Sequence, residues 1–299
     1  MAPNVPVAVA QRAADAAGGT LSALIARAAQ GTHQECPWEL VTVAGPTVEA
    51  RAAAAWIVAD AIMAGRTGLD TESYQVWREA TLSGTPLDGP NRIIVHGYAY
   101  PVFDAAGRER DADVKYHGLA GYVSEWLWYL TLKEAPSNAG ESVEFLSSPG
   151  PTSTDSGGDG IVIHRLQGNT TSFIFRLWEM KKFTSEKSDD VGPTIRKAVK
   201  QLNDFGHVYL AAFSWADKHL AADTRIFVST LPRQWAKAEP TSNAGISVAV
   251  DFAPSKAFHT AHKHLPTHTH PGALCGRIVA IDNFESFADD VREYVWTAL

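Results

Sequence analysis

Two carboxylates and one ammonium group are spaced so that a short hairpin would bring them together. Asp159 precedes an apolar stretch at 161–167, and Glu179 and Lys181 lie near the end of a second apolar stretch at 172–183. Residues two apart in a strand point to the same face, so Glu179 and Lys181 share one face. Antiparallel pairing of the two stretches would place Asp159 beside Glu179.

Such a trio can hydrolyse a phosphodiester bond. Two carboxylates bind a hard divalent cation, Mg²⁺ or Mn²⁺, which keeps several of its waters. The cation polarises a phosphoryl oxygen and lowers the pKa of a bound water. The lysine can steer that water, help to deprotonate it and stabilise charge on the phosphorane. The residue types therefore predict a metal-dependent hydrolase that acts on a phosphodiester.

The elements around the trio follow from local patterns. A Gly-Asn turn at 168–169 predicts that the two apolar stretches form a β-hairpin. A polar, glycine-rich loop at 147–160 leads into it, and loops of this kind often border a site. The apolar stretch at 117–134 predicts a helix that carries the acid Glu125. Pro193 marks the start of a helix after the hairpin.

The rest of the chain predicts a mixed α/β (α+β) fold, with a β-sheet flanked by helices. Helices are expected at 7–30, broken near Gly18, at 48–65 and at 285–299. Residues 66–92 are expected to be mainly loop. Strands are expected at 93–103, 208–216, 224–231, 245–253 and 275–284, although 208–216 also suits a prolonged helix. We expect an α-rich N-terminal extension at 1–114 and a nuclease domain at 115–299.

The sequence GGDG, a strand, a turn and a strand ending in WEMKK resembles the PD-(D/E)XK nuclease superfamily. The hallmark Asp and Glu-x-Lys of that superfamily match Asp159, Glu179 and Lys181. The resemblance implies a restriction-endonuclease-like core and a metal bound by Asp159, Glu179 and Glu125, the acid of the preceding helix. It also implies a catalytic role for Gln201 on the following helix.

The resemblance covers roughly residues 115–232, with two departures from the pattern. No proline directly precedes Asp159, and Phe205 stands where some branches have tyrosine. Both positions are variable in the superfamily. A lone Glu-x-Lys is common at solvated strand edges. The resemblance therefore depends on the whole pattern of Asp, strand, turn, strand and Glu-x-Lys between an acid-bearing and a basic helix.

A narrower likeness concerns the apolar helix HGLAGYVSEWLWYL and the GGDG loop that follows it. Together they look like the nuclease subunits of bacterial anti-phage systems, including Hachiman-type systems. That likeness implies an antiviral DNA nuclease that is restrained until infection. It also implies a helicase or ATPase partner, because the chain has no nucleotide-binding loop of its own.

The net charge of −7 excludes a globally basic nucleic-acid-binding protein, but it allows a local basic surface. Basic residues follow the hairpin, and phosphate contacts give affinity for DNA without regard to sequence. The candidates are Lys182, Arg196, Lys197 and Lys200. An ordinary charged helix face is the alternative interpretation.

Composition and missing motifs narrow the other classes. With 45% hydrophobic and 20% charged residues the chain is typical of a globular protein, and its two cysteines exclude a disulfide framework. No apolar run of membrane-spanning length and no good signal peptide are found, so a cytoplasmic protein without a membrane span is expected. No Walker loop, Gly-x-Ser-x-Gly or Gly-x-Gly-x-x-Gly occurs.

Two other classes of function remain open, a sequence-specific nuclease and a non-catalytic protein. A restriction-type endonuclease would share the catalytic frame and read bases through 232–299. A non-catalytic binding or structural subunit would have a degenerate core, which the intact trio argues against. The five histidines of 258–270 could bind zinc, but the two prolines there and the lack of nearby acids favour a mobile, partly exposed loop.

Overall fold

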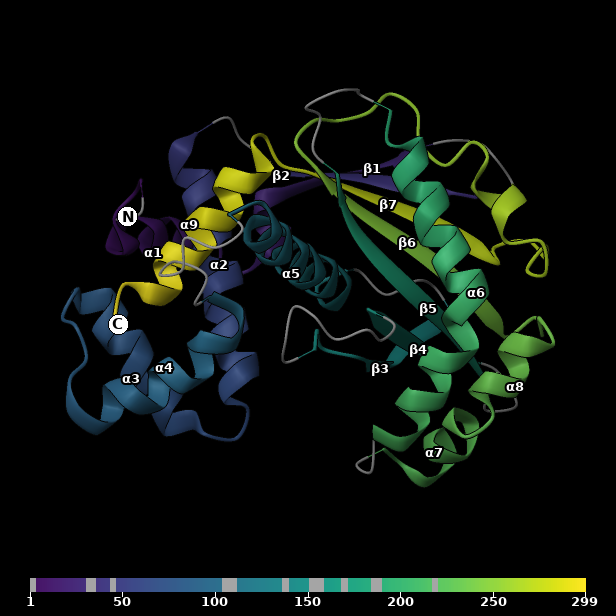
Figure 1. The fold of residues 1–299 in the computed structure, drawn as a ribbon, viewed down its shortest axis with the longest axis horizontal. Coiled ribbons are helices and arrows are strands. Elements are labelled where there is room, and N and C mark those ends of the chain that lie inside the picture. Colours follow the sequence, from purple (N-terminus) through teal and green to yellow (C-terminus); the bar gives the residue numbers. More distant parts are fainter. Residues whose placement is uncertain are drawn as a thin grey trace.

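A computed structural model describes residues 4–30, 36–43, 47–103, 112–135, 140–150, 159–167, 172–183, 190–216 and 220–299. Within these residues the chain forms a mixed sheet with the strand order β1-β2-β7-β6-β5-β4-β3 (Figure 1). The strands are β1 (Ile25–Gln30), β2 (Trp38–Val43), β3 (Glu141–Leu146), β4 (Gly160–Leu166), β5 (Ser172–Phe183), β6 (Ser242–Val250) and β7 (Leu274–Ala280).

The centre of the sheet is parallel and its edges are antiparallel. β5, β6, β7 and β2 pair in parallel, while β4 and β3 on one side and β1 on the other pair antiparallel. All nine residues of β6 are buried, as expected for a parallel strand that is covered on both faces. The predicted mixed α/β fold, a sheet flanked by helices, is therefore confirmed.

The helices lie on both faces of the sheet and in a group beside it (Figure 1). They are α1 (Val7–Ala16), α2 (Val48–Thr67), α3 (Thr71–Ser83), α4 (Gly89–Phe103), α5 (Ala112–Lys133), α6 (Gly192–Ala216), α7 (Ala222–Val228), α8 (Leu231–Ala236) and α9 (Phe284–Trp296). Short 3₁₀ turns occupy Leu21–Leu24 and Ala261–His264. α1–α4 pack together with α9, so both ends of the chain contribute to this group.

The alternation of β5 assigns its side chains to two different cores. Phe175 and Leu177 pack in the core beneath α6, and we call this side of the sheet the α6 face. Trp178 and Met180 point the other way and pack with Trp128 of α5, on what we call the α5 face. This division decides which predicted site residues can meet.

Several predicted helices and strands are confirmed. The predicted hairpin strands match β4 and β5, and the strands expected at 245–253 and 275–284 match β6 and β7 within a few residues. The helix predicted at 48–65 is α2, whose first turn is capped by the Thr47 hydroxyl, which accepts from the Ala50 amide at 3.2 Å.

The prediction of a strand at 93–103 is wrong, because these residues belong to α4. Val95 and Ala99 are buried four residues apart, and Ile93 is 74% exposed, which is the period of a helix rather than of a strand. A short apolar run without clear alternation does not distinguish the two structures. Packing against the other helices of the group decided between them.

The strand predicted at 224–231 is wrong for the same reason. Thr224 and Val228 are buried while Ile226 between them is 70% exposed, and the segment forms α7. Residues 208–216 prolong α6, which was the alternative for that stretch. Residues 71–83 form α3 where loop was expected, with the Asp70 carboxylate capping its first turn.

The N-terminal region contributes two strands, β1 and β2, that its alanine-rich composition does not predict. Residues 25–30, predicted as helix, form the edge strand β1, and β2 was not predicted. An alanine-rich strand such as β1 has little intrinsic preference for a sheet, so pairing with β2 decides its state. β3 was also missed. The sheet thus draws strands from both sides of the boundary predicted at residue 114.

The contact between α5 and β4 leaves no room for a side chain at Gly160. An added Cβ there would lie 2.2 Å from the Trp128 ring. We expect Gly160→Ala to lower the free energy of unfolding by about 1–3 kcal/mol, the usual cost of overpacking a core. Gly121→Ala is the matched control, because an added Cβ there meets nothing within 4 Å. Urea unfolding that showed both variants to be as stable as the wild type would contradict the close contact.

Candidate active site beside the β4–β5 hairpin

The hairpin places Asp159 beside the end of β5, as the sequence predicts. Gly160 pairs with Trp178 in the antiparallel register, so the next residue outward, Asp159, comes opposite Glu179. The Asp159 carboxylate accepts a hydrogen bond of 2.6 Å from the Met180 amide. The predicted Gly-Asn turn at 168–169 lies outside the described residues.

Glu179 is a fully buried carboxylate with one oxygen unsatisfied. Its side chain is 0% exposed, and its Oε1 forms an ion pair with the Lys181 ammonium. Its Oε2 is buried and has no hydrogen-bond partner within the described part of the chain. A buried oxygen in this state is costly, and each such case in a folded protein calls for an explanation. Binding of a cation would satisfy this oxygen.

Burial raises the pKa of Glu179 to about 8, and the neighbouring charge of Asp159 raises it further, while Lys181 opposes the shift. Burial also raises the pKa of Asp159, against the opposing effects of Lys181 and of the Met180 amide. Burial alone would lower the pKa of Lys181, but Glu179 and Asp159 outweigh it and the net direction is upward. In the metal-free site the two carboxylates therefore resist being ionised together, and the lysine stays charged.

The donors of this site suit a hard divalent cation. Two adjacent carboxylates supply oxygen ligands, and Mg²⁺ commonly binds through one or two carboxylates while waters and substrate phosphates complete its shell. Among the residues that the structure describes, no group of three or more His, Cys, Asp or Glu could hold a metal ion. A cation held by two carboxylates would leave the remaining positions of its shell to water and substrate oxygens.

Glu125, the predicted third acid, does not join the pair. It lies on α5, one turn before Trp128, which contacts the α5 face of the sheet. Glu179 and Lys181 alternate with Trp178 and so belong to the opposite face. Burial raises the pKa of the nearby Tyr122 phenol, and the charge of Glu125 adds to that rise.

Gln201 reaches the site through a residue that sequence analysis missed. Its amide donates a 2.8 Å hydrogen bond to the hydroxyl of Tyr209. The pKa of Tyr209 is raised by burial and then by the charges of Glu179 and Asp159, so the phenol lies within electrostatic reach of the trio. The spacing in the sequence could have indicated Tyr209, because a residue two turns after Gln201 lies on a similar side of the helix.

The four predicted phosphate-binding residues separate into two places. Lys182 belongs to the α5 face, where its ammonium pairs with Glu285 of α9 at 3.1 Å and its side chain is 14% exposed. Arg196, Lys197 and Lys200 are exposed on α6. Lys200 also pairs with Asp204 one turn away, a surface pair that leaves it 72% exposed. Only the α6 residues form an open cationic surface.

The histidine-rich segment is not an exposed loop throughout, contrary to the expectation from sequence. His268 is buried, and the centroid of its ring lies 4.4 Å from that of the Trp235 ring. Its Nε2 lies 3.1 Å from the Ser242 hydroxyl and its Nδ1 lies 3.0 Å from the Thr267 hydroxyl. The Nε2 of His270 lies 3.2 Å from the side-chain Oδ1 of Asn243. These two histidines therefore serve packing and hydrogen bonding.

Comparison of the chain with family models, with curated proteins and with solved structures found no match. Of the helices described, none is long and apolar enough to cross a membrane.

Proposed function

We propose that this protein is a metal-dependent nuclease that hydrolyses phosphodiester bonds of DNA, with a PD-(D/E)XK-type site on a restriction-endonuclease-like core. One observation carries the proposal. The fully buried Glu179 holds an unpartnered oxygen beside Asp159 and is paired with Lys181. A structural ion pair with Lys181 would need only one of these carboxylates, and the unsatisfied second oxygen of Glu179 is costly without a ligand.

The residues of the chain have separate tasks in this proposal. Asp159 and Glu179 would hold a divalent cation, which when bound supplies Lewis-acid activation of the phosphoryl group and of a water. The Met180 amide fixes the Asp159 carboxylate by a 2.6 Å hydrogen bond, so one ligand is oriented in advance. Lys181, held by Glu179, offers a cation to charge that develops on the phosphate. Gln201 positions the Tyr209 hydroxyl at the edge of the site.

Metal binding and cleavage can be tested in separate experiments. We expect the purified chain to bind Mn²⁺ in a calorimetric titration, and Asp159→Asn and Glu179→Gln to lose that binding. Cleavage of plasmid DNA should require Mg²⁺ or Mn²⁺ and stop with EDTA. If the wild type bound neither ion, or cut equally well in EDTA, the proposed chemistry would be wrong.

The exposed cations of α6 favour nucleic acid as the substrate. Lys197 and Gln201 are four residues apart on this helix, so the cation lies on the same side as a residue connected to the site. We expect Lys197→Gln with Lys200→Gln to weaken DNA binding without regard to sequence. The slope of log K against log salt should become shallower by about 1.8, roughly 0.9 for each phosphate that the double variant no longer neutralises.

Lys182→Gln is the comparison for that experiment, because this lysine already pairs with Glu285. Fluorescence anisotropy over a range of salt concentrations measures all the variants. A larger loss of affinity for Lys182→Gln than for the α6 double variant would move the DNA path to the other face of the sheet.

A regulatory partner, such as a helicase or ATPase subunit in a cytoplasmic anti-phage system, is part of the same proposal. Large apolar side chains are exposed on the helical group, with Leu69 fully exposed and Ile93 and Ile94 at 74% and 46%. Such residues suit contact with another protein. Co-purification from the native host, with Ile93→Asp and Leu69→Asp as test variants, should recover the partner only with the wild type.

A further inference from the structure

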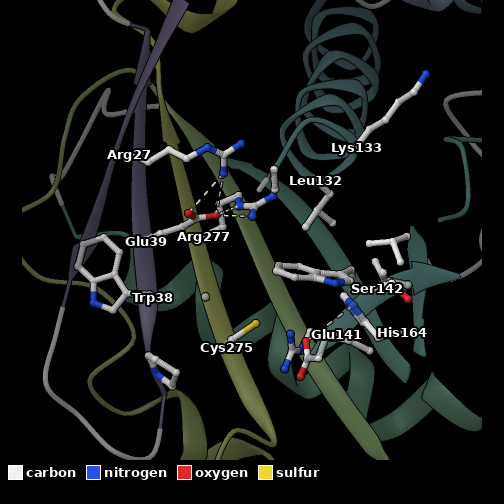
Figure 2. A pocket seen from close by; sticks show the side chains of 17 residues that line it. Arg27, Trp38, Glu39, Leu132, Lys133, Glu141, Ser142, His164, Cys275 and Arg277 are labelled. Carbon is white, nitrogen blue, oxygen red and sulfur yellow. Dashed lines mark hydrogen bonds and ion pairs between the residues drawn. The ribbon is translucent and has the colours of Figure 1, made fainter. Parts of the chain in front are cut away.

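A cavity of about 550 Å³ lies on the α5 face of the sheet, and Figure 2 shows the side chains that line it. Its walls come from β1, β2, β7, β5, β4, β3 and the end of α5. Its size falls within the range of small-molecule sites. Its charged residues are Arg27, Glu39, Lys133, Glu141, Arg176 and Arg277, so cations outnumber carboxylates four to two.

One wall holds two arginines around one carboxylate. Figure 2 shows Arg27, Glu39 and Arg277 converging there, and the Glu39 carboxylate pairs with both guanidinium groups. Arg277 is 5% exposed and also donates to the Thr131 hydroxyl at 2.9 Å. Since a single carboxylate faces two guanidinium groups, this wall remains cationic.

Arg176 adds a cation that no described carboxylate neutralises. Its Nε is buried without a hydrogen-bond partner, and its Nη2 donates only a 3.3 Å bond to the Gly272 carbonyl. The pKa values of two neighbouring histidines, His164 and His270, are lowered mainly by burial and further by the positive charge of Arg176. His164 lies 3.9 Å from Glu141, and with its pKa lowered it is neutral near pH 7. It therefore adds no positive charge to that of the arginines and the lysine.

We propose that this cavity binds a phosphorylated small molecule of nucleotide size, with Arg176 as its principal phosphate ligand. A guanidinium presents a planar fork of N–H donors that matches phosphate oxygens, and here one N–H is left unused. Val162 and Trp178 give the cavity an apolar floor for the rest of the ligand. Lys133 stands at the rim and points outward in Figure 2.

The site is separate from the hydrolytic trio. Arg176 and Trp178 point to the α5 face of β5, while Glu179 and Lys181 point to the α6 face. A ligand in the cavity would therefore lie across the sheet from the trio and would not need the divalent cation. The proposal is independent of the proposed nuclease function.

The chain contains its own reporter of occupancy. Of its two cysteines, Cys275 lines the cavity, whereas Cys36 is buried and its pKa is raised to about 12, mainly by burial. Iodoacetamide should therefore modify Cys275 first, and mass spectrometry can follow each cysteine in its own peptide. We expect inorganic pyrophosphate and AMP, in metal-free buffer with EDTA, to slow modification of Cys275 saturably, and adenosine to have no effect.

Variants test the assigned ligand in both directions. Arg176→Gln should abolish the protection, and Arg176→Lys, which keeps the charge but loses the fork, should weaken binding of pyrophosphate by roughly tenfold. Glu141→Gln removes an opposing carboxylate and should tighten binding. Calorimetric titration of the wild type with pyrophosphate provides a second measurement, in case Arg176→Gln does not fold.

Three results would overturn the proposal. The first is the absence of both heat and protection with millimolar pyrophosphate and AMP. The second is equal protection by sodium chloride at matched ionic strength, or unchanged protection in a folded Arg176→Gln. The third is protection by a single-stranded oligonucleotide but not by pyrophosphate or AMP, which would make the cavity part of a nucleic-acid path.

Discussion

Glu179→Gln is expected to abolish metal-dependent DNA cleavage, with a fall in rate of at least about 10²–10³-fold, the loss typical when one group that stabilises transition-state charge is removed. Glutamine has nearly the same shape and keeps one carbonyl oxygen, but it cannot neutralise a divalent cation beside Asp159. Plasmid cleavage under single-turnover conditions measures the effect.

Two further variants make this experiment specific. Glu72→Gln, at an exposed position in the first turn of α3, is the matched control and should cleave like the wild type. Lys181→Met should also lose cleavage but keep binding of Mn²⁺, because the lysine is not a metal ligand. Cleavage by Glu179→Gln at the wild-type rate would remove this residue from the mechanism.

The metal-free protein is expected to lose stability as the pH rises from about 5 to above 8. The pKa of Glu179 is raised from 4.5 to about 8, so the folded state holds a proton that the unfolded state releases. The contribution of Glu179 is fully present below pH 4.5, declines as the pH rises and is lost above about 8. The size of the effect is on the order of a few kcal/mol in the free energy of unfolding.

Urea unfolding in EDTA across this pH range measures the loss, and the difference between wild type and Glu179→Gln gives the contribution of Glu179 together with its coupling to Asp159 and Lys181. Groups that do not contact Glu179 also titrate, His268 among them, whose pKa is lowered to about 4 mainly by burial, and these cancel in that difference. Mg²⁺ should restore stability to the wild type at pH 8 and leave the variant unchanged. An identical pH dependence in the two proteins would show that Glu179 is ionised in the folded state.

The hairpin at the heart of the site could be predicted from sequence because its determinants are local. β5 runs over the predicted residues 172–183, and alternation along it correctly paired Glu179 with Lys181 on one face. The register that brings Asp159 opposite Glu179 follows from antiparallel pairing of two neighbouring strands. No long-range contact had to be known for these inferences.

The positions of Glu125 and Lys182 could not be predicted in the same way. Sequence shows that Glu125 lies on a helix, but whether that helix covers the face of Glu179 or of Trp178 depends on how the chain returns to the sheet. Lys182 lies next to Lys181, yet its partner Glu285 is on α9, 103 residues away. Such contacts arise only when distant elements pack together, so the residue pattern within one element does not predict them.

The sequence alone determined the short-range features of this protein: the hairpin, the carboxylate pair with its lysine, the helix that carries Gln201, and a mixed sheet with helices. Tertiary structure decided the edge strands β1 and β3, the strand β2 beside β1, the burial that shifts the pKa of Glu179, and the arginine-lined cavity. That cavity joins residues from Arg27 to Arg277. Alternation and capping act over a few residues and can be read from the chain. Desolvation and charge clustering depend on which distant segments meet, and only the folded molecule determines that.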